Sequence, residues 1–152
     1  MIWALLLTLQ APAPSEATYE GLVALGLEQA REGRPLEARA TLERAILLDS
    51  RRPEALVERS GLDFLEARYD AAAAGLARAL SLRDDPYARE LRASALQLAG
   101  RYEDALDEWN RLGQPALGEV RILGLAKTRD RVARRELRFG EGTLVRADAF
   151  RE

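Results

Sequence analysis

The 152-residue chain contains no cysteine and no histidine, and Lys127 is its only lysine. Without cysteine it can form no disulfide and offers no thiolate to a metal or a substrate. Without histidine it lacks the commonest general base and the commonest metal ligand. No nucleophile–base pair, phosphate-binding loop or metal-ligand set can be assembled from its residues. We therefore predict a protein that is not an enzyme and that uses no cofactor.

Charge and hydropathy are both unremarkable. The net charge of −2 gives the whole chain no attraction to nucleic acid or to an anionic membrane surface. With 47% hydrophobic residues, the chain can bury one core, or can form a short solenoid with a small additional element.

A pattern with a period of 33 or 34 residues runs through the middle of the chain. Three sets of residues keep this spacing: Gly33, Ala67 and Gly100; Ala38, Ala72 and Ala105; and Leu42, Leu76 and Trp109. Self-similarity at such a period indicates stacked supersecondary units. Within the first unit, Gly33 is suited to end a helix and Pro35 to begin the next one.

These residues resemble the tetratricopeptide repeat (TPR) family, whose unit is a helix–turn–helix of about 34 residues. The resemblance implies a mainly all-α fold with three TPR units in a short right-handed solenoid, at residues 19–52, 53–85 and 86–115. The chain departs from the family pattern at three places. Ala67 replaces a turn glycine, Arg59 takes a usually apolar position, and Leu112 stands where a small residue is usual.

The same resemblance implies a concave groove, lined by the first helix of each unit, that binds a peptide or a partner helix. By repeat position, the predicted groove residues are Val23, Leu27, Arg31, Glu54, Val57, Phe64, Tyr87, Glu90, Ser94 and Gln97. TPR modules that grip the C-terminal carboxylate of chaperones use Lys, Arg and Asn at such positions, whereas these residues are mainly apolar and acidic. We therefore expect no carboxylate clamp. Alternatively, these side chains only cap helices or face water.

Residues 1–17 form a separate segment. The apolar run at residues 2–9, IWALLLTL, is too short to span a bilayer, which needs about 20 residues, but it suits the core of a secretory signal peptide. Ala11 and Ala13 supply small residues for cleavage, although no basic residue precedes the run. The alternative is an apolar strand or helix that packs on the first repeat. In both cases residues 10–15, QAPAPS, form an extended linker.

The C-terminal segment is basic. Residues 121–138 hold seven Arg or Lys and two Asp or Glu, a local charge of +5. The pattern predicts a short strand at residues 119–124 and a helix over residues 128–138 with arginines on one face. Such a face could follow a phosphate backbone, but no aromatic residue is interleaved to stack on bases. We therefore expect no nucleic-acid partner, and interpret the arginines as a solvated face that pairs partly with the acidic solenoid.

Residues 118–152 also resemble the opening of a POTRA (polypeptide-transport-associated) domain of the outer-membrane β-barrel assembly family. The matching residues include Gly124, Thr128, Arg134, Arg135, Glu136, Leu137 and Gly142. The resemblance implies a partial α/β unit, consisting of a first strand, a first helix and the start of a second helix.

Together these features give two hypotheses. The first is a non-catalytic scaffold in a bacterial periplasm, resembling the soluble N-terminal part of an outer-membrane protein assembly or translocation factor. Its partners would be peptides or helices in the groove, together with an outer-membrane barrel or client strands. The second is a free-standing TPR adaptor, cytoplasmic or periplasmic, whose tail is a capping helix that begins near Ala116. Neither hypothesis has this chain span a membrane.

Overall fold

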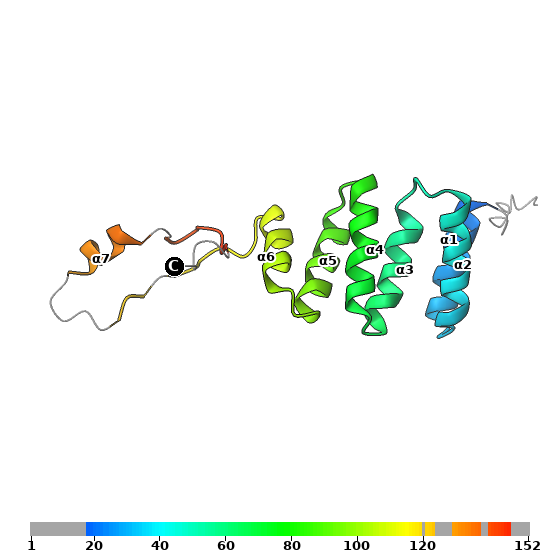
Figure 1. Ribbon diagram of the computed structural model, residues 1–152, viewed down its shortest axis with the longest axis horizontal. Helices are drawn as coiled ribbons and strands as arrows, with labels where there is room; N and C mark the ends of the chain where they lie inside the picture. The colour runs from blue at the N-terminus through cyan, green and yellow to red at the C-terminus, as the bar shows by residue number, and fades with distance from the viewer. Residues whose placement is uncertain (1–17, 120, 124–128, 138–139, 147–152) are drawn as a thin grey trace, which may run out of the picture.

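Six helices follow one another along a single row (Figure 1). In this computed structural model the described residues are 18–119, 121–123, 129–137 and 140–146. The helices are α1 (Tyr19–Arg31), α2 (Pro35–Leu48), α3 (Glu54–Leu65), α4 (Tyr69–Leu82), α5 (Pro86–Leu98) and α6 (Tyr102–Arg111). The apolar run at residues 2–9, with its predicted signal peptide, lies outside the described residues.

The helices pack in two layers. Each helix contacts the next one in sequence, and in addition α1 contacts α3 and α3 contacts α5. The first helix of each pair therefore belongs to one continuous layer, as expected when helical hairpins stack into a solenoid. The predicted mainly α-helical repeat fold is confirmed.

The turn inside each hairpin has the same backbone hydrogen bonds. In the first, the Arg34 N–H donates to the Gln29 carbonyl at 2.9 Å, across Gly33, whose φ is 75°. This is the Schellman motif, in which a residue in the left-handed conformation closes the end of a helix. The second hairpin repeats the geometry with Ala67 at φ 58°, and the third with Gly100 at φ 79°. The turn positions predicted from the period are thus correct, and Ala67 adopts a conformation that usually requires glycine.

Alanines occupy most of the helix-facing positions of the core. The fully buried ones are spread over α2 to α6: Ala38, Ala45, Ala55, Ala72, Ala79, Ala88, Ala93, Ala95 and Ala105. Their methyl groups let neighbouring helices approach closely, while Leu42, Leu56, Leu76 and Leu96 fill the space between them.

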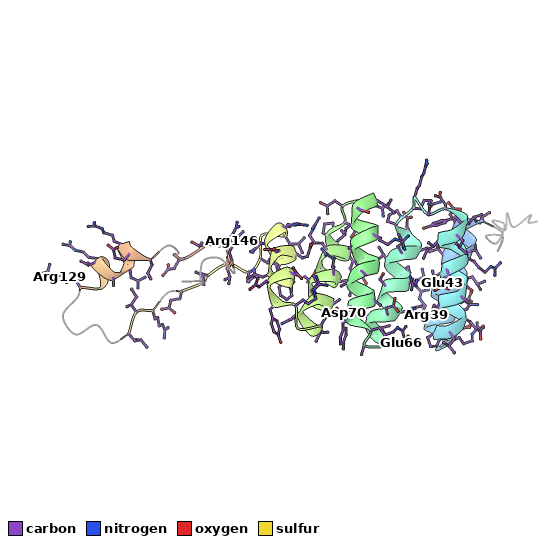
Figure 2. The ribbon with its side chains drawn as sticks, in the orientation of Figure 1. Arg39, Glu43, Glu66, Asp70, Arg129 and Arg146 are labelled. Atoms are coloured by element: carbon purple, nitrogen blue, oxygen red, sulfur yellow. The ribbon has the colours of Figure 1, made fainter. Side chains whose placement is uncertain are left out.

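Two interior carboxylates are each surrounded by arginines. Asp63 on α3 is 2% exposed and lies 2.8 Å from Arg39 and 2.9 Å from Arg68. Arg39 also reaches Glu66 at 3.1 Å, so that α2 and α3 are joined by charge as well as by packing (Figure 2). Burying a carboxylate is tolerated only when it is paired and hydrogen-bonded in this way.

The second interior carboxylate joins α5 to α6. Glu108 is 3% exposed and is paired with Arg89 at 2.6 Å, with Arg111 at 3.2 Å and with Arg92.

The unusual arginine at position 59 is also accounted for by charge. Its guanidinium lies 3.6 Å from Glu43 on α2 and 4.0 Å from Asp63. The position that the TPR resemblance predicts to be apolar therefore carries a charged side chain close to two carboxylates.

A tyrosine of the first repeat caps the first helix of the second. Pro53 precedes α3 and has no side-chain oxygen to accept a hydrogen bond from the helix N-terminus. The Tyr19 hydroxyl does so instead, accepting from the Ala55 N–H at 2.9 Å. The guanidinium of Arg52 stacks 4.0 Å from the centre of the same ring.

The tail differs from the prediction. After α6 and Gly113 the chain is not helical at residues 114–119, so the capping helix expected from Ala116 is wrong. Instead, residues 115–117 pair with residues 142–145, through hydrogen bonds from the Leu117 N–H to Thr143 and from the Val145 N–H to Pro115, both 2.8 Å. Within the described residues this pairing is an isolated antiparallel bridge, Ala116 with Leu144, and no strand is formed.

The partial POTRA-like unit is therefore not supported. Residues 119 and 121–123, which were expected in a strand, are outside any strand, and Leu123 is 87% exposed. A lone strand without a partner does not persist in water, which explains this result. A helix is present at the predicted place, but α7 runs only over Asp130–Glu136, far from α6 in Figure 1.

The residues of the proposed POTRA motif are placed as follows. Arg134, Arg135 and Glu136 lie on α7, Leu137 follows it, and Gly142 lies in a turn at φ 79°. Gly124 and Thr128 lie outside the described residues.

Candidate functional site

A groove opens on the layer of first helices. It encloses about 350 Å³, and its lining comes from α1, α3 and α5 with one residue of α2. The lining residues are Gly26, Leu27, Ala30, Leu42, Glu58, Gly61, Leu62, Phe64, Leu65, Tyr87 and Leu91. Apart from Glu58, these side chains are apolar or aromatic, as is usual for cavities that hold a ligand.

Two large side chains of the groove are left facing solvent. Leu65 at the end of α3 is 81% exposed, and Tyr87 at the start of α5 is 67% exposed. Phe64 beside them is half-buried and meets the ring of Tyr69 edge-on, with 5.6 Å between the ring centres. Apolar side chains that are exposed together on one surface are a feature of binding sites, because a partner can remove them from water.

Glu58 is the charged residue of this lining. It is half-buried on α3, and no side chain in the described part of the chain donates a hydrogen bond to its carboxylate. Burial raises the pKa of Glu58 above its usual value, and the positive charge of Arg31 on α1 opposes this rise. The groove thus presents one incompletely compensated negative charge among apolar groups.

The structure brings three of the predicted groove residues to this cavity, Leu27, Phe64 and Tyr87. The other seven lie outside its lining. Arg31, Glu90 and Gln97 are exposed, and Val23, Val57 and Ser94 are half-buried. Glu54, at the first turn of α3, pairs with Arg83 at 2.9 Å and approaches Arg52 at 3.6 Å. Binding by these residues stays a prediction.

Sequence reasoning missed Glu58 and Leu91. The two are 33 residues apart (91 − 58), so they occupy the same place in the second and third repeats. In both repeats the prediction chose the preceding residue, Val57 and Glu90. The repeat spacing relates these two positions to each other, and each directly follows a predicted groove residue, at about 100° around the helix.

Neither a metal centre nor a membrane span is found in the part of the chain that the structure describes. Within it, no group of three or more Asp, Glu, His or Cys side chains could hold a metal ion. None of its helices combines the length and the apolar character that crossing a bilayer requires.

Comparison with known proteins links the chain to others through its fold. No protein-family model matches the sequence, and no curated protein matches it either. Solved structures do match: the crystal structure of MamA has a TM-score of 0.58 and 23% identity. That match covers 61% of this chain, which spans only 55% of the MamA chain.

Two further solved structures are similar. The second TPR of Spaghetti (RPAP3), bound to the HSP90 peptide SRMEEVD, has a TM-score of 0.59 and 18% identity, with 62% of this chain and 89% of that one covered. The N-terminal domain of stress-induced protein-1 (STI-1) from C. elegans has a TM-score of 0.57 and 18% identity, with coverage of 62% and 84%. At these identities the likeness concerns the fold. The six helices have a TPR-like fold.

Proposed function

We propose that this chain is a non-catalytic protein–protein interaction scaffold, which binds a peptide or a partner helix in the groove formed by α1, α3 and α5. The observation that carries the proposal is the apolar groove itself, with Leu65 and Tyr87 exposed on it. The similar TPR of RPAP3, whose structure contains a peptide, supports the same kind of partner.

The expected affinity is modest. Full burial of a large apolar side chain contributes about 1.5–3 kcal/mol, so Leu65 and Tyr87 together would supply about 3–6 kcal/mol. Association itself costs about 4–15 kcal/mol in lost freedom of motion. A partner therefore needs further contacts along the groove to bind even at micromolar concentration.

Of the two hypotheses from the sequence, we favour the free-standing adaptor, without its capping helix. The periplasmic outer-membrane assembly factor depends on the run at residues 2–9 and on the motif in the tail. The pairing of residues 115–117 with 142–145 and the similar structures give that version no support.

A display library of random peptides tests the proposal. Peptides selected on the full chain are measured against a Leu65→Ala/Tyr87→Ala variant and a matched Leu36→Ala/Leu47→Ala variant. Leu36 and Leu47 are 78% and 85% exposed but lie on α2, outside the groove lining. We expect the first pair of substitutions to weaken binding at least about tenfold and the second to leave it unchanged. Equal effects of both pairs would refute the groove as the binding site.

A further inference from the structure

We propose that the segment bound in the groove is apolar and carries one basic side chain, which forms an ion pair with Glu58. This inference rests on the function proposed above and adds the chemical class of the partner. It is based on the position of the Glu58 carboxylate within the groove and on the ion pairs that Asp63 and Glu108 form but Glu58, among the described residues, does not.

Glu58 lies where a bound segment would pass. It is on α3, the middle helix of the layer, which contacts both α1 and α5. One turn further along α3 is Gly61, where an added Cβ atom would meet no other atom within 4 Å. The groove is therefore open beside the carboxylate, and a side chain entering from solvent has room to reach it.

Among the described residues, the two acids that are less than 5% exposed, Asp63 and Glu108, are both paired with arginines. Asp63 has two arginines within 3 Å, and Glu108 is paired with three. Glu58 has no such ion pair among the described residues, although it is half-buried. A desolvated carboxylate without a partner is costly, and a cation supplied by a ligand would remove that cost.

The surroundings of Glu58 leave few competitors for that cation. Of the eleven residues that line the groove, ten are uncharged. Arg31 of α1 acts on the carboxylate electrostatically but lies outside the lining, and from α5 the titratable residue of the lining is Tyr87. The raised pKa of Glu58 is what its burial without an adjacent ion pair should produce.

The same charge argues against an acidic ligand. The peptide bound by the second TPR of RPAP3, SRMEEVD, carries three carboxylate side chains and one arginine. Because carboxylates outnumber the guanidinium three to one, this peptide is net acidic, and its approach to a groove whose one charged lining residue is Glu58 is electrostatically unfavourable. We expect SRMEEVD not to bind.

The test is a double-mutant cycle between protein and peptide. A peptide selected on the full chain for its Lys or Arg is compared with the same peptide carrying Met at that position. Both are titrated by fluorescence polarisation against the wild-type chain and Glu58→Gln, which keeps the size of the side chain. Far-UV circular dichroism confirms that the variant folds. We expect Glu58→Gln to weaken the basic peptide at least about tenfold and to leave the Met peptide unchanged.

Each alternative outcome is decisive. If both peptides respond equally to Glu58→Gln, or if selection on the groove yields no basic residue, the ion pair is refuted while the groove remains a peptide site. Tight binding of SRMEEVD to the wild-type groove that is unchanged when its arginine is replaced by Met would also overturn the inference. If no selected peptide is sensitive to the Leu65→Ala/Tyr87→Ala change, the proposed function fails, and the inference falls with it.

Discussion

The α3–α4 contact is so close at Gly75 that replacing this glycine by alanine should destabilise the protein. A Cβ atom at position 75 would lie well inside contact distance of the Ser60 Oγ atom. Ser60 is 2% exposed, and its hydroxyl donates to the Leu56 carbonyl at 2.7 Å. Moving the hydroxyl away from the new Cβ atom would therefore break this hydrogen bond inside the core.

Two opposing terms set the magnitude. In the interior of a helix, alanine is more favourable than glycine by about 0.5–1 kcal/mol. Against this, the Ser60 hydroxyl must give up its acceptor while buried, or α4 must move away from α3. Either change costs about 1–3 kcal/mol. We expect Gly75→Ala to lower the free energy of unfolding by about 1–2 kcal/mol.

The sign should reverse when the hydroxyl is removed. With Ser60→Ala in place, the nearest side-chain atom to the new Cβ is the Cβ of residue 60, at 3.4 Å, which is an ordinary contact. Only the helical preference for alanine then remains, so Gly75→Ala should stabilise this background by about 0.5–1 kcal/mol. The coupling energy between the two positions is expected to be about 2 kcal/mol.

Urea unfolding followed by far-UV circular dichroism measures all four proteins of this cycle. Gly61→Ala on the adjacent helix is the control, because its Cβ would meet nothing within 4 Å. That substitution should stabilise by about 0.5–1 kcal/mol. A Gly75→Ala effect that is the same with and without the Ser60 hydroxyl would refute the reasoning.

Four further predictions concern stability. Tyr19→Phe leaves the buried Ala55 N–H without its acceptor and should cost about 1–3 kcal/mol in urea unfolding; a loss below about 0.5 kcal/mol would show that water replaces the hydroxyl. Ala67→Gly removes the strain of an alanine in the left-handed conformation, about 1–2 kcal/mol, and adds about 0.4–1 kcal/mol of conformational entropy to the unfolded chain. The urea midpoint of unfolding should therefore rise, and a lower midpoint would show that Ala67 is not strained. Leu123→Asp should leave the thermal midpoint unchanged, because the side chain is exposed, whereas a clear drop would indicate a buried contact. Glu58→Gln should stabilise the chain at neutral pH. Burial raises the pKa of Glu58 in the folded state above its value in the unfolded state. The wild type therefore loses stability as pH rises from the unfolded-state pKa through the folded-state pKa, whereas the variant does not. Parallel profiles of stability against pH for the two proteins would refute this.

The sequence predicted the helices and the turns correctly, because these features recur in every repeat. The 33–34-residue spacing predicted six helices, and it also placed the three hairpin turns, because a residue in the left-handed conformation must follow each first helix. Even the irregular turn at Ala67 was located correctly.

The groove and the tail depend on helix rotation and on contacts between distant residues, which the repeat spacing does not specify. Glu58 faces the groove only because of the rotation of α3, which a repeat pattern fixes to within a residue at best. The role of Arg59 becomes visible only when α2 brings Glu43 beside it. In the tail, a motif of about 35 residues predicted a strand at residues 119–124. The observed pairing instead joins residues 115–117 to residues 142–145, and no alternation of apolar residues in the sequence predicts it.

That pairing brings residues 142–145 back beside residues 115–117, which directly follow the last repeat. α7 comes between these two stretches in the sequence and is drawn well beyond α6 in Figure 1, whereas the groove lies among α1, α3 and α5. A ligand that engaged both would have to bridge the end of the helical row. Its avidity would then be set by the length and stiffness of its own linker, through the effective concentration of the second site, rather than by any contact within the groove.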